Sequence, residues 1–254
     1  MNPTPDKQAP APPPSEAARE LVRRGRAAMR LFDIEGYEQA VPLLREAIEQ
    51  APDHAPAYAA LAETYSYWGF RREIAGFDSQ HLYDMALENA NVALTLAPDL
   101  AECHRAMAVA LRRGTASDPQ RRKAEVTTAL DLAPDDPETL WEHWRAFGYE
   151  PDDPGLRRAL ELEPGLCGAH IDLGAVYCER GEIEAAVREL TKALQINPRN
   201  SLAYYDLAMS LDRKGHSAVA LDILKRIAKM HPGDPLIETG VEFLEAKPCP
   251  APRP

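Results

Sequence analysis

Three side chains that can bind a metal or act in thiol chemistry lie within one short stretch of the sequence. Cys167 and His170 are three residues apart, and Cys178 follows eight residues later. Residues three apart share one face of a helix, so a thiolate and an imidazole there could bind Zn²⁺ together. The sequence offers no second ligand pair and no CxxC motif to complete a four-ligand site. A thiol- or metal-dependent enzyme at these residues is kept as an alternative hypothesis, and we expect no cofactor.

Signals for phosphate binding are missing from the sequence. Neither GxGxxG nor GxxxxGK followed by Ser or Thr occurs, so no glycine-rich loop is predicted to hold a nucleotide. Acidic residues outnumber basic residues by 40 to 29, which gives a net charge of −11. A field of that sign repels phosphate backbones and anionic lipid surfaces. We therefore expect no nucleic-acid partner and no membrane insertion.

The amino terminus and the cysteine content predict a cytoplasmic protein. The first residues form no apolar core and include no lipid-accepting cysteine, and no run approaches the roughly 18 apolar residues of a membrane span. The four cysteines are too sparse for a disulfide framework.

The stretch that contains Cys178 is one copy of a repeat. Residues 173–200 and 207–234 align with an offset of 34 residues. The matching positions hold identical residues in the pairs Leu173 and Leu207, Gly181 and Gly215, Ala186 and Ala220, and Pro198 and Pro232. Successive units end at Pro52, Pro98, Pro134, Pro164, Pro198 and Pro232. A period near 34 predicts an array of small helical units.

Each unit is predicted to be a pair of antiparallel helices. In the fifth unit an apolar stripe with spacing i, i+3, i+4, i+7 consists of His170, Leu173, Gly174 and Tyr177. A second stripe follows Gly181 and ends before Pro198, which cannot donate a backbone hydrogen bond. Small residues such as Gly174 let two helices approach closely, so a bulky residue at that position should destabilise the array.

This spacing resembles the tetratricopeptide repeat, whose pattern is W-x2-L-G-x2-Y, then A-x3-F, then P. The fifth unit departs from the pattern only at His170 and Leu190, and the sixth unit has the same spacing. The resemblance implies an all-α fold, a right-handed α-solenoid of about six helix pairs with a C-terminal capping helix. It also assigns His170 to a buried packing position.

The resemblance covers residues 19–246. We predict repeat units at 21–54, 55–100, 101–136, 137–166, 167–200 and 201–234, with the cap at 235–246. The proline-rich ends, residues 1–18 and 247–254, are expected to be disordered. An insertion at 67–79 should either lengthen the helices of the second unit or form a loop. In the fourth unit, Pro151 and Pro154 leave room for only a short second helix.

In an array of this type the first helices line a concave groove that binds other proteins. The groove-facing positions predict the partner-binding residues Glu63, Tyr67, Arg105, Arg112, Trp141, Arg145, Tyr205 and Met209. Aromatic, arginine and methionine side chains often dominate binding energy. We therefore predict a non-enzymatic scaffold or adaptor for an acidic or amphipathic peptide or protein partner. Arg105→Glu is expected to weaken binding and to leave folding intact.

Two narrower functions of the family were compared with the sequence. The positions of the family's carboxylate clamp hold Gly25, Met29, Ala60, Glu102 and Ala106, which disfavours a co-chaperone. Arrays of this type also resemble assembly factors for pilus or secretin complexes. That alternative stays open, although such factors are usually lipoproteins and the lipid-accepting cysteine is missing.

Overall fold

The computed structural model describes residues 14–247, and every regular element in that range is an α-helix. In chain order the helices are α1 (Glu16–Met29), α2 (Ile34–Gln50), α3 (Ala55–Ile74), α4 (Gln80–Leu96), α5 (Ala101–Ala110), α6 (Pro119–Leu132), α7 (Pro137–Phe147), α8 (Pro154–Leu162), α9 (Cys167–Glu179), α10 (Ile183–Ile196), α11 (Ser201–Arg213), α12 (Ser217–Met230) and α13 (Pro235–Glu245). The first helix begins three residues before the predicted start of the array, because Ser15 caps it by accepting a hydrogen bond from the Ala18 N–H. The predicted tails lie largely outside the described residues.

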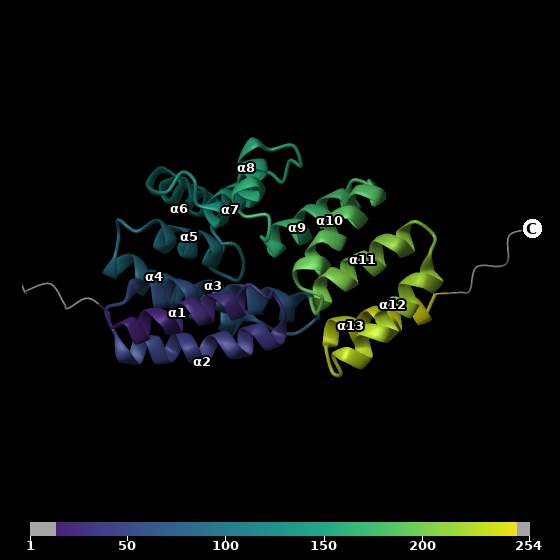
Figure 1. Cartoon of the computed structure of the whole chain (residues 1–254), viewed down its shortest axis with the longest axis horizontal. Helices are drawn as coiled ribbons and strands as arrows, with labels where there is room; N and C mark the ends of the chain where they lie inside the picture. The colour runs from purple at the N-terminus through teal and green to yellow at the C-terminus, as the bar shows by residue number, and fades with distance from the viewer. Residues whose placement is uncertain (1–13, 248–254) are drawn as a thin grey trace, which may run out of the picture.

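Consecutive helices pack in pairs, from α1 with α2 to α11 with α12, and α13 packs on α12 and α11. In Figure 1, α1 to α4 lie at the lower left, α5 to α8 lie above them, and α9 to α13 return downward on the right. The predicted all-α solenoid of helix pairs is therefore confirmed. None of the described helices is both long and apolar enough to cross a membrane.

Small residues bring the two helices of a unit into close contact. A Cβ atom added to Gly174 would lie only 2.6 Å from Cγ of Leu190 on the partner helix. Gly25 makes the same approach to Leu44 in the first unit, at 2.7 Å. Because overpacked cores force the helices apart, a side chain at either glycine is expected to cost about 1–3 kcal/mol.

Two units depart from the regular plan. The insertion at 67–79 lengthens a helix, because α3 runs for 20 residues through to Ile74. In the fourth unit, α8 has only nine residues and starts at Pro154, with Asp153 as its N-cap. Trp144 stands where the repeat pattern has a small residue, and its indole N–H donates to the Glu150 carbonyl at 2.8 Å in the loop that replaces the missing turn.

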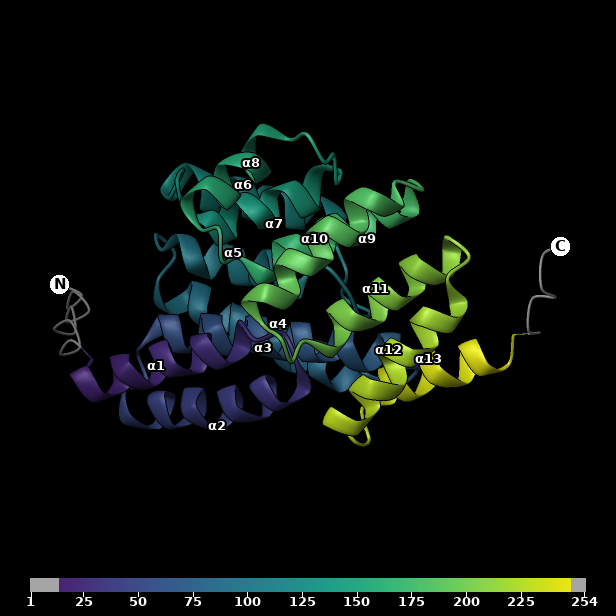
Figure 2. The same ribbon diagram turned by 45° about the vertical axis from the view of Figure 1, so that its right-hand side comes forward.

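The first and second units contact the fifth and sixth units across the concave side of the array. The side-chain amide of Asn197 donates to the Leu31 carbonyl at 2.6 Å, and that of Asn200 donates to the same oxygen at 2.9 Å. Farther along, Arg71 donates to Ser201 Oγ at 2.8 Å. Figure 2 shows the loop between α10 and α11 reaching the α1–α2 pair. The groove is thereby closed over its middle by the chain itself.

Phe32 lies at this closure and has a strained backbone conformation. It lies two residues before α2, and the equivalent positions before α10 and α12 are Gly181 and Gly215. All three have positive φ, +53° at Phe32, +77° at Gly181 and +88° at Gly215. A bulky side chain disfavours that region of backbone space, so the phenylalanine is held there by its surroundings.

Candidate functional site

The eight residues predicted to line one groove lie in three separate environments. Glu63 and Arg105 belong to a buried ion cluster. Tyr67, Arg112, Trp141 and Arg145 line a small cavity in the middle of the array. Tyr205 and Met209 line a larger, open groove at the carboxyl-terminal end. Only this last pair lies at a surface with room for a partner segment.

Arg105 is the centre of the buried ion cluster and is only 4% exposed. Its guanidinium donates from Nε to Glu63 at 2.8 Å and from Nη1 to Asp136 at 2.6 Å, and Nη2 lies 2.8 Å from Glu138. Arg30 adds a 2.7 Å bond to Glu138. Arg105 thus joins the second, third and fourth units, and Arg30 links the first unit to the same cluster through Glu138.

The neighbouring charges determine the pKa values of Arg105 and Glu138. Burial alone lowers the pKa of Arg105, but Glu63, Glu138 and Asp136 more than offset it and hold that pKa well above its usual value. For Glu138, burial acts to raise the pKa, and the surrounding arginines, Arg105 first, overcome it and lower the pKa to about 2. Arg105 is therefore a permanently charged structural residue. The expectation that Arg105→Glu leaves folding intact is corrected by this burial, since the substitution would gather four carboxylates.

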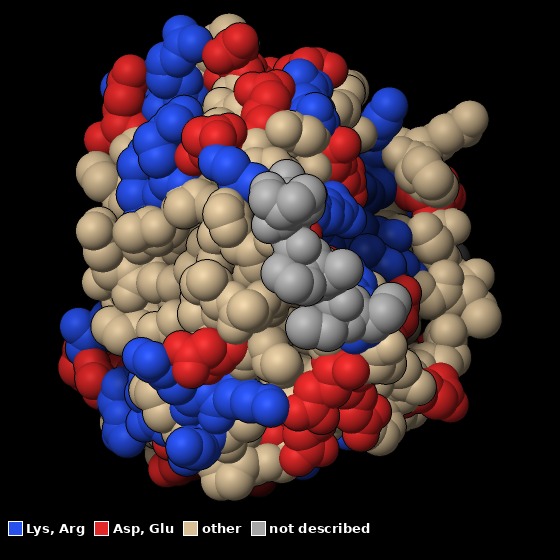
Figure 3. All heavy atoms as spheres, turned by 90° about the vertical axis from the view of Figure 1, so that its right-hand side faces the viewer, with Lys and Arg blue, Asp and Glu red and all other residues tan. Residues whose placement is uncertain are grey.

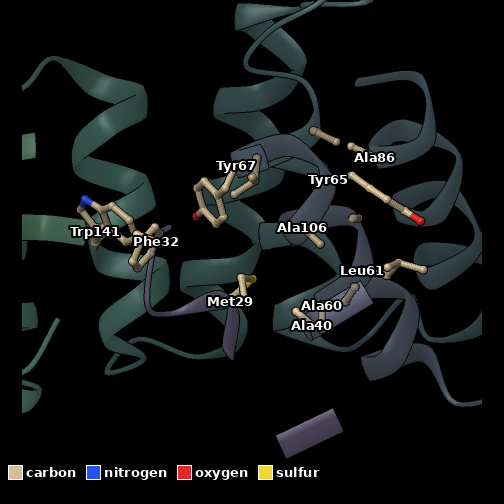
Figure 4. Close-up of a cluster of buried hydrophobic side chains, with 14 of the residues drawn as sticks. Met29, Phe32, Ala40, Ala60, Leu61, Tyr65, Tyr67, Ala86, Ala106 and Trp141 are labelled. Atoms are coloured by element: carbon tan, nitrogen blue, oxygen red, sulfur yellow. The ribbon is translucent and has the colours of Figure 1, made fainter. Parts of the chain in front are cut away.

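Aromatic side chains fill most of the concave side above the ion cluster. The Phe32 ring lies 5.3 Å from Tyr67 and 5.8 Å from Trp141, edge-on to both, and the latter two rings stack at 6.3 Å. Figure 4 shows Phe32 beside Trp141 and facing Tyr67. Arg145 lies over Trp141, with 4.6 Å between its guanidinium carbon and the ring centre. What remains is a cavity of about 30 Å³.

The open groove lies between α9, α11 and α13 and has a volume of about 520 Å³. Its lining combines apolar, acidic and basic side chains, namely Ala175, Cys178, Glu179, Tyr205, Asp206, Met209, Asp212, Arg213, Phe243 and Lys247. Phe243 is 51% exposed, and the Lys247 ammonium lies 4.7 Å from the centre of its ring. Burial raises the pKa of Asp206 to about 7. On the side of the molecule seen in Figure 3, charges of both signs surround a wide area without charged side chains.

Cys167 and His170 have structural roles in this arrangement. Cys167 is 3% exposed, its thiol donates to the Ala193 carbonyl at 3.6 Å, and burial raises its pKa to about 12. The His170 ring bonds Glu189 at 2.8 Å and the Pro164 carbonyl at 3.3 Å.

The third unit repeats the histidine arrangement. The His104 ring bonds Glu125 at 2.8 Å and the Pro98 carbonyl at 2.7 Å. In both units the histidine thus ties the first helix to the second helix and to the preceding proline loop. The same contacts at equivalent positions of two units indicate that this histidine has a packing role in the repeat.

Cys178 lies apart from the buried pair, in the open groove. Its sulfur accepts hydrogen bonds from Ser210 Oγ at 3.1 Å and Arg213 Nη1 at 3.2 Å. Within residues 14–247, no three His, Cys, Asp or Glu side chains converge in a way that could hold a metal ion. The three residues with which the sequence analysis opened are therefore not brought together.

Several residues of these sites were not predicted. Arg71 lines the central cavity, and Asp206 and Phe243 line the open groove. Arg71 lies in the insertion, where the frame assigns no position, and Phe243 lies beyond the last repeat.

Comparison with known proteins identifies the repeat. The family described as "TPR repeat" matches residues 174–215, which span the end of the fifth unit and the start of the sixth. This segment is therefore similar to the tetratricopeptide repeat. Superkiller protein 3 of Saccharomyces cerevisiae is 34% identical over 74 residues, which is 29% of this chain and 5% of that protein. The shared segment is thus a small part of the yeast protein.

Solved structures share the architecture of this chain at low sequence identity. Human IFIT1 in a dimer with m7Gppp-AAAA has a TM-score of 0.67 at 17% identity over 88% of this chain and 52% of its own. The APC/C hetero-tetramer Cut9-Hcn1 gives 0.60 at 14% identity, over 90% of this chain and 45% of that one. The chain therefore spans about half the length of these structures, and the similarity establishes the fold.

Proposed function

We propose that this protein is a non-enzymatic scaffold that binds an amphipathic segment of a partner protein in the open groove between α9, α11 and α13. The observation that supports this site is its volume of about 520 Å³, against about 30 Å³ for what is left of the groove in the middle of the array. A preformed concave surface binds a peptide without the entropic cost of ordering itself.

The lining of the groove favours an amphipathic occupant. Met209 and Phe243 offer apolar surface, and methionine adapts its shape to an irregular partner. Three carboxylates and two cations surround them, contributed by Glu179, Asp206, Asp212, Arg213 and Lys247. Lys247 forms an ion pair with Asp212. A segment with apolar side chains and charges of both signs matches this surface.

An acidic partner was also expected, because of arginines in the middle of the array. Arg105 and Arg145 are now engaged by carboxylates of the chain itself, and both are buried. The open groove has no excess of cations. Its charge thus supports the amphipathic alternative over the acidic one.

The similar structures include a complex of different chains and a complex with an oligonucleotide. Cut9-Hcn1 is a hetero-tetramer, so an array of this fold takes part there in a complex of different chains. IFIT1 was solved with m7Gppp-AAAA, so the same fold holds a capped oligonucleotide in that protein. For this chain the net charge of −11 favours a protein partner.

A substitution at Met209 tests the proposal. A photo-crosslinking residue at position 209 is expected to label a segment of a partner in native lysate, and a synthetic peptide of that segment should bind the protein in fluorescence polarisation. Met209→Glu should weaken that binding about tenfold or more, as for loss of a central contact. Met230→Glu is the matched control, because Met230 is 53% exposed on α12 and does not line the groove. Equal peptide affinity in both variants would refute the site.

A further inference from the structure

The small central cavity contains buried hydrogen-bond donors that the chain leaves unused. Arg71 from α3, Arg112 from the end of α5 and Arg145 from α7 all line it. Arg71 is 2% exposed and Arg145 is 3% exposed. These three arginines come from three different repeat units and line one small cavity.

Several N–H groups of these arginines have no hydrogen-bond partner among the described residues. They are Nε and Nη1 of Arg71 and Nε and Nη2 of Arg112. A buried donor without a partner costs about 1–3 kcal/mol, and more when the group is charged. Four such donors on two arginines that line one cavity therefore indicate an acceptor that binds there.

The charges around the cavity also favour an acceptor with negative charge. Arg145 is neutralised, by Glu142 at 3.0 Å and Asp172 at 3.1 Å, and Arg71 has one contact with Asp234 at 3.3 Å. Arg112 forms no ion pair with any residue from 14 to 247, and its guanidinium lies over the rings of Tyr67 and Phe70 at 6.0 and 5.3 Å. The only carboxylate in the lining is Asp172. The cavity is thus short of negative charge.

The size of the cavity limits what the acceptor can be. Space for one water molecule takes about 10–15 Å³ on the same measure, so about 30 Å³ admits a group of two or three heavy atoms. The lining also includes aromatic side chains, among them Phe32, Tyr37 and Trp141. A flat group with two oxygens meets these conditions, since an arginine fork binds a carboxylate through paired hydrogen bonds.

We propose that the central cavity is a carboxylate-binding site, in which Arg71 and Arg112 donate to the two oxygens of one carboxylate group. The site is separate from the open groove and does not depend on it. An occupant would hold the second and third units together, since each contributes one of these arginines. Binding to the folded state alone would stabilise the closed array.

Formate is the probe for this site, because it is a bare carboxylate of the right size. Sodium chloride is exchanged for sodium formate at constant ionic strength, and the melting temperature and the arginine Nε–H signals in ¹H–¹⁵N spectra are followed. We expect a saturable rise in melting temperature and shifts of the Arg71 and Arg112 signals. Unchanged spectra and melting temperature would show that water alone satisfies these donors, which would overturn the proposal.

Arg112→Gln is the decisive variant, and Arg113→Gln is its matched control. The two arginines are neighbours and both lie over Phe70, but Arg113 is paired with Glu73 and does not line the cavity. Arg112→Gln should weaken formate binding at least about tenfold, and Arg113→Gln should leave it unchanged. If Arg112→Gln does not fold, Arg112→Lys keeps the charge, loses the fork and should still weaken binding. An equal response in the variant and the control would contradict the site.

Two sources could supply the carboxylate, a free small acid or the carboxyl terminus of a peptide. A tetrapeptide with a free carboxyl terminus is compared with its amide in competition with formate. Displacement of formate by the free peptide alone assigns the group to a chain end. Binding of formate without competition from either peptide assigns it to a small acid. These tests use variants outside the open groove, so their outcome is distinguishable from that of the Met209 experiment.

Discussion

Arg105 and Glu63 form an ion pair that is shielded from solvent, with 2.8 Å between Nε and Oε1 and side-chain exposures of 5% and 2%. They lie on different helix pairs, so the bond joins the second and third units. Removal of the arginine leaves Glu63 and Glu138 buried without their main partner. Loss of one member of such a pair costs about 3–5 kcal/mol.

Arg105→Ala is therefore predicted to lower the free energy of unfolding by that amount, measured by urea denaturation. Arg158→Ala is the control, because Arg158 pairs with Asp135 at the surface, where a salt bridge contributes about 0–1 kcal/mol. Similar losses in the two variants would mean that the cluster is far more hydrated than its burial indicates.

Two substitutions at Phe32 separate the effect of its backbone conformation on stability from the effect of its ring. Phe32→Ala removes the ring that packs edge-on against Tyr67 and Trp141 and retains the unfavourable φ of +53°, so it should cost about 3–5 kcal/mol. Phe32→Gly loses the same ring but tolerates that φ, and should be about 1 kcal/mol more stable than the alanine variant. Equilibrium denaturation of both gives the order. An alanine variant as stable as the glycine variant would show that the backbone there is not strained.

Asn200 caps α11 and also closes the array, which makes its removal more costly than the loss of an ordinary cap. Its side chain accepts from the Ala203 N–H at 2.9 Å and donates to the Leu31 carbonyl. We predict that Asn200→Ala costs about 2–4 kcal/mol, whereas Asp153→Ala, which removes only the α8 cap, costs about 1 kcal/mol. Hydrogen exchange should show faster opening of α1 and α2 in the Asn200 variant. Unaltered exchange in these helices would mean that the contact does not hold the first unit in place.

Asp206 should make stability depend on pH. Its folded-state pKa of about 7 lies above the ordinary value of 3.8, so its protonated form is favoured by folding. That stability is complete below pH 4 and is lost as the pH rises towards 7. Asp206→Asn should therefore be roughly 1–3 kcal/mol more stable than wild type at pH 8 and about equal at pH 4, a half-buried side chain giving less than the full linkage value.

Urea denaturation at the two pH values measures this difference. Asp222→Asn, at an exposed position on α12, should show no such change. A gain from Asp206→Asn that is the same at pH 4 and pH 8 would contradict the raised pKa.

The fold was predictable because helix pairs are encoded locally. Gly174 and Leu190 lie in one unit, and their spacing in the sequence already specifies that two helices meet there. The short α8 was predictable for the same reason, since Pro154 starts it and cannot belong to the interior of a longer helix. Each of these inferences needs only residues within one repeat.

The site was less predictable because it depends on contacts between distant units. The repeat frame predicts that Arg105 and Trp141 point to the concave side, but it cannot show that Phe32 and Asn200 close that side. Curvature accumulates from small rotations between successive units, and no single residue determines it. Tyr205 and Met209 remain at an open surface because they lie beyond the point of closure.

The bond between Asn200 and the Leu31 carbonyl also has a consequence for how this chain folds. Its partners are 169 residues apart, and those of the Arg71–Asp234 contact are 163 apart. An open array folds through contacts between neighbours, can nucleate in any unit and has a low contact order. Here the last step must wait until the first and the later units have formed, and it carries the entropic cost of closing a loop of 169 residues. The helix pairs should thus form quickly, and the contacts between distant units should form slowly. After these contacts have formed, the terminal units are protected from local unfolding in a way that an open array lacks.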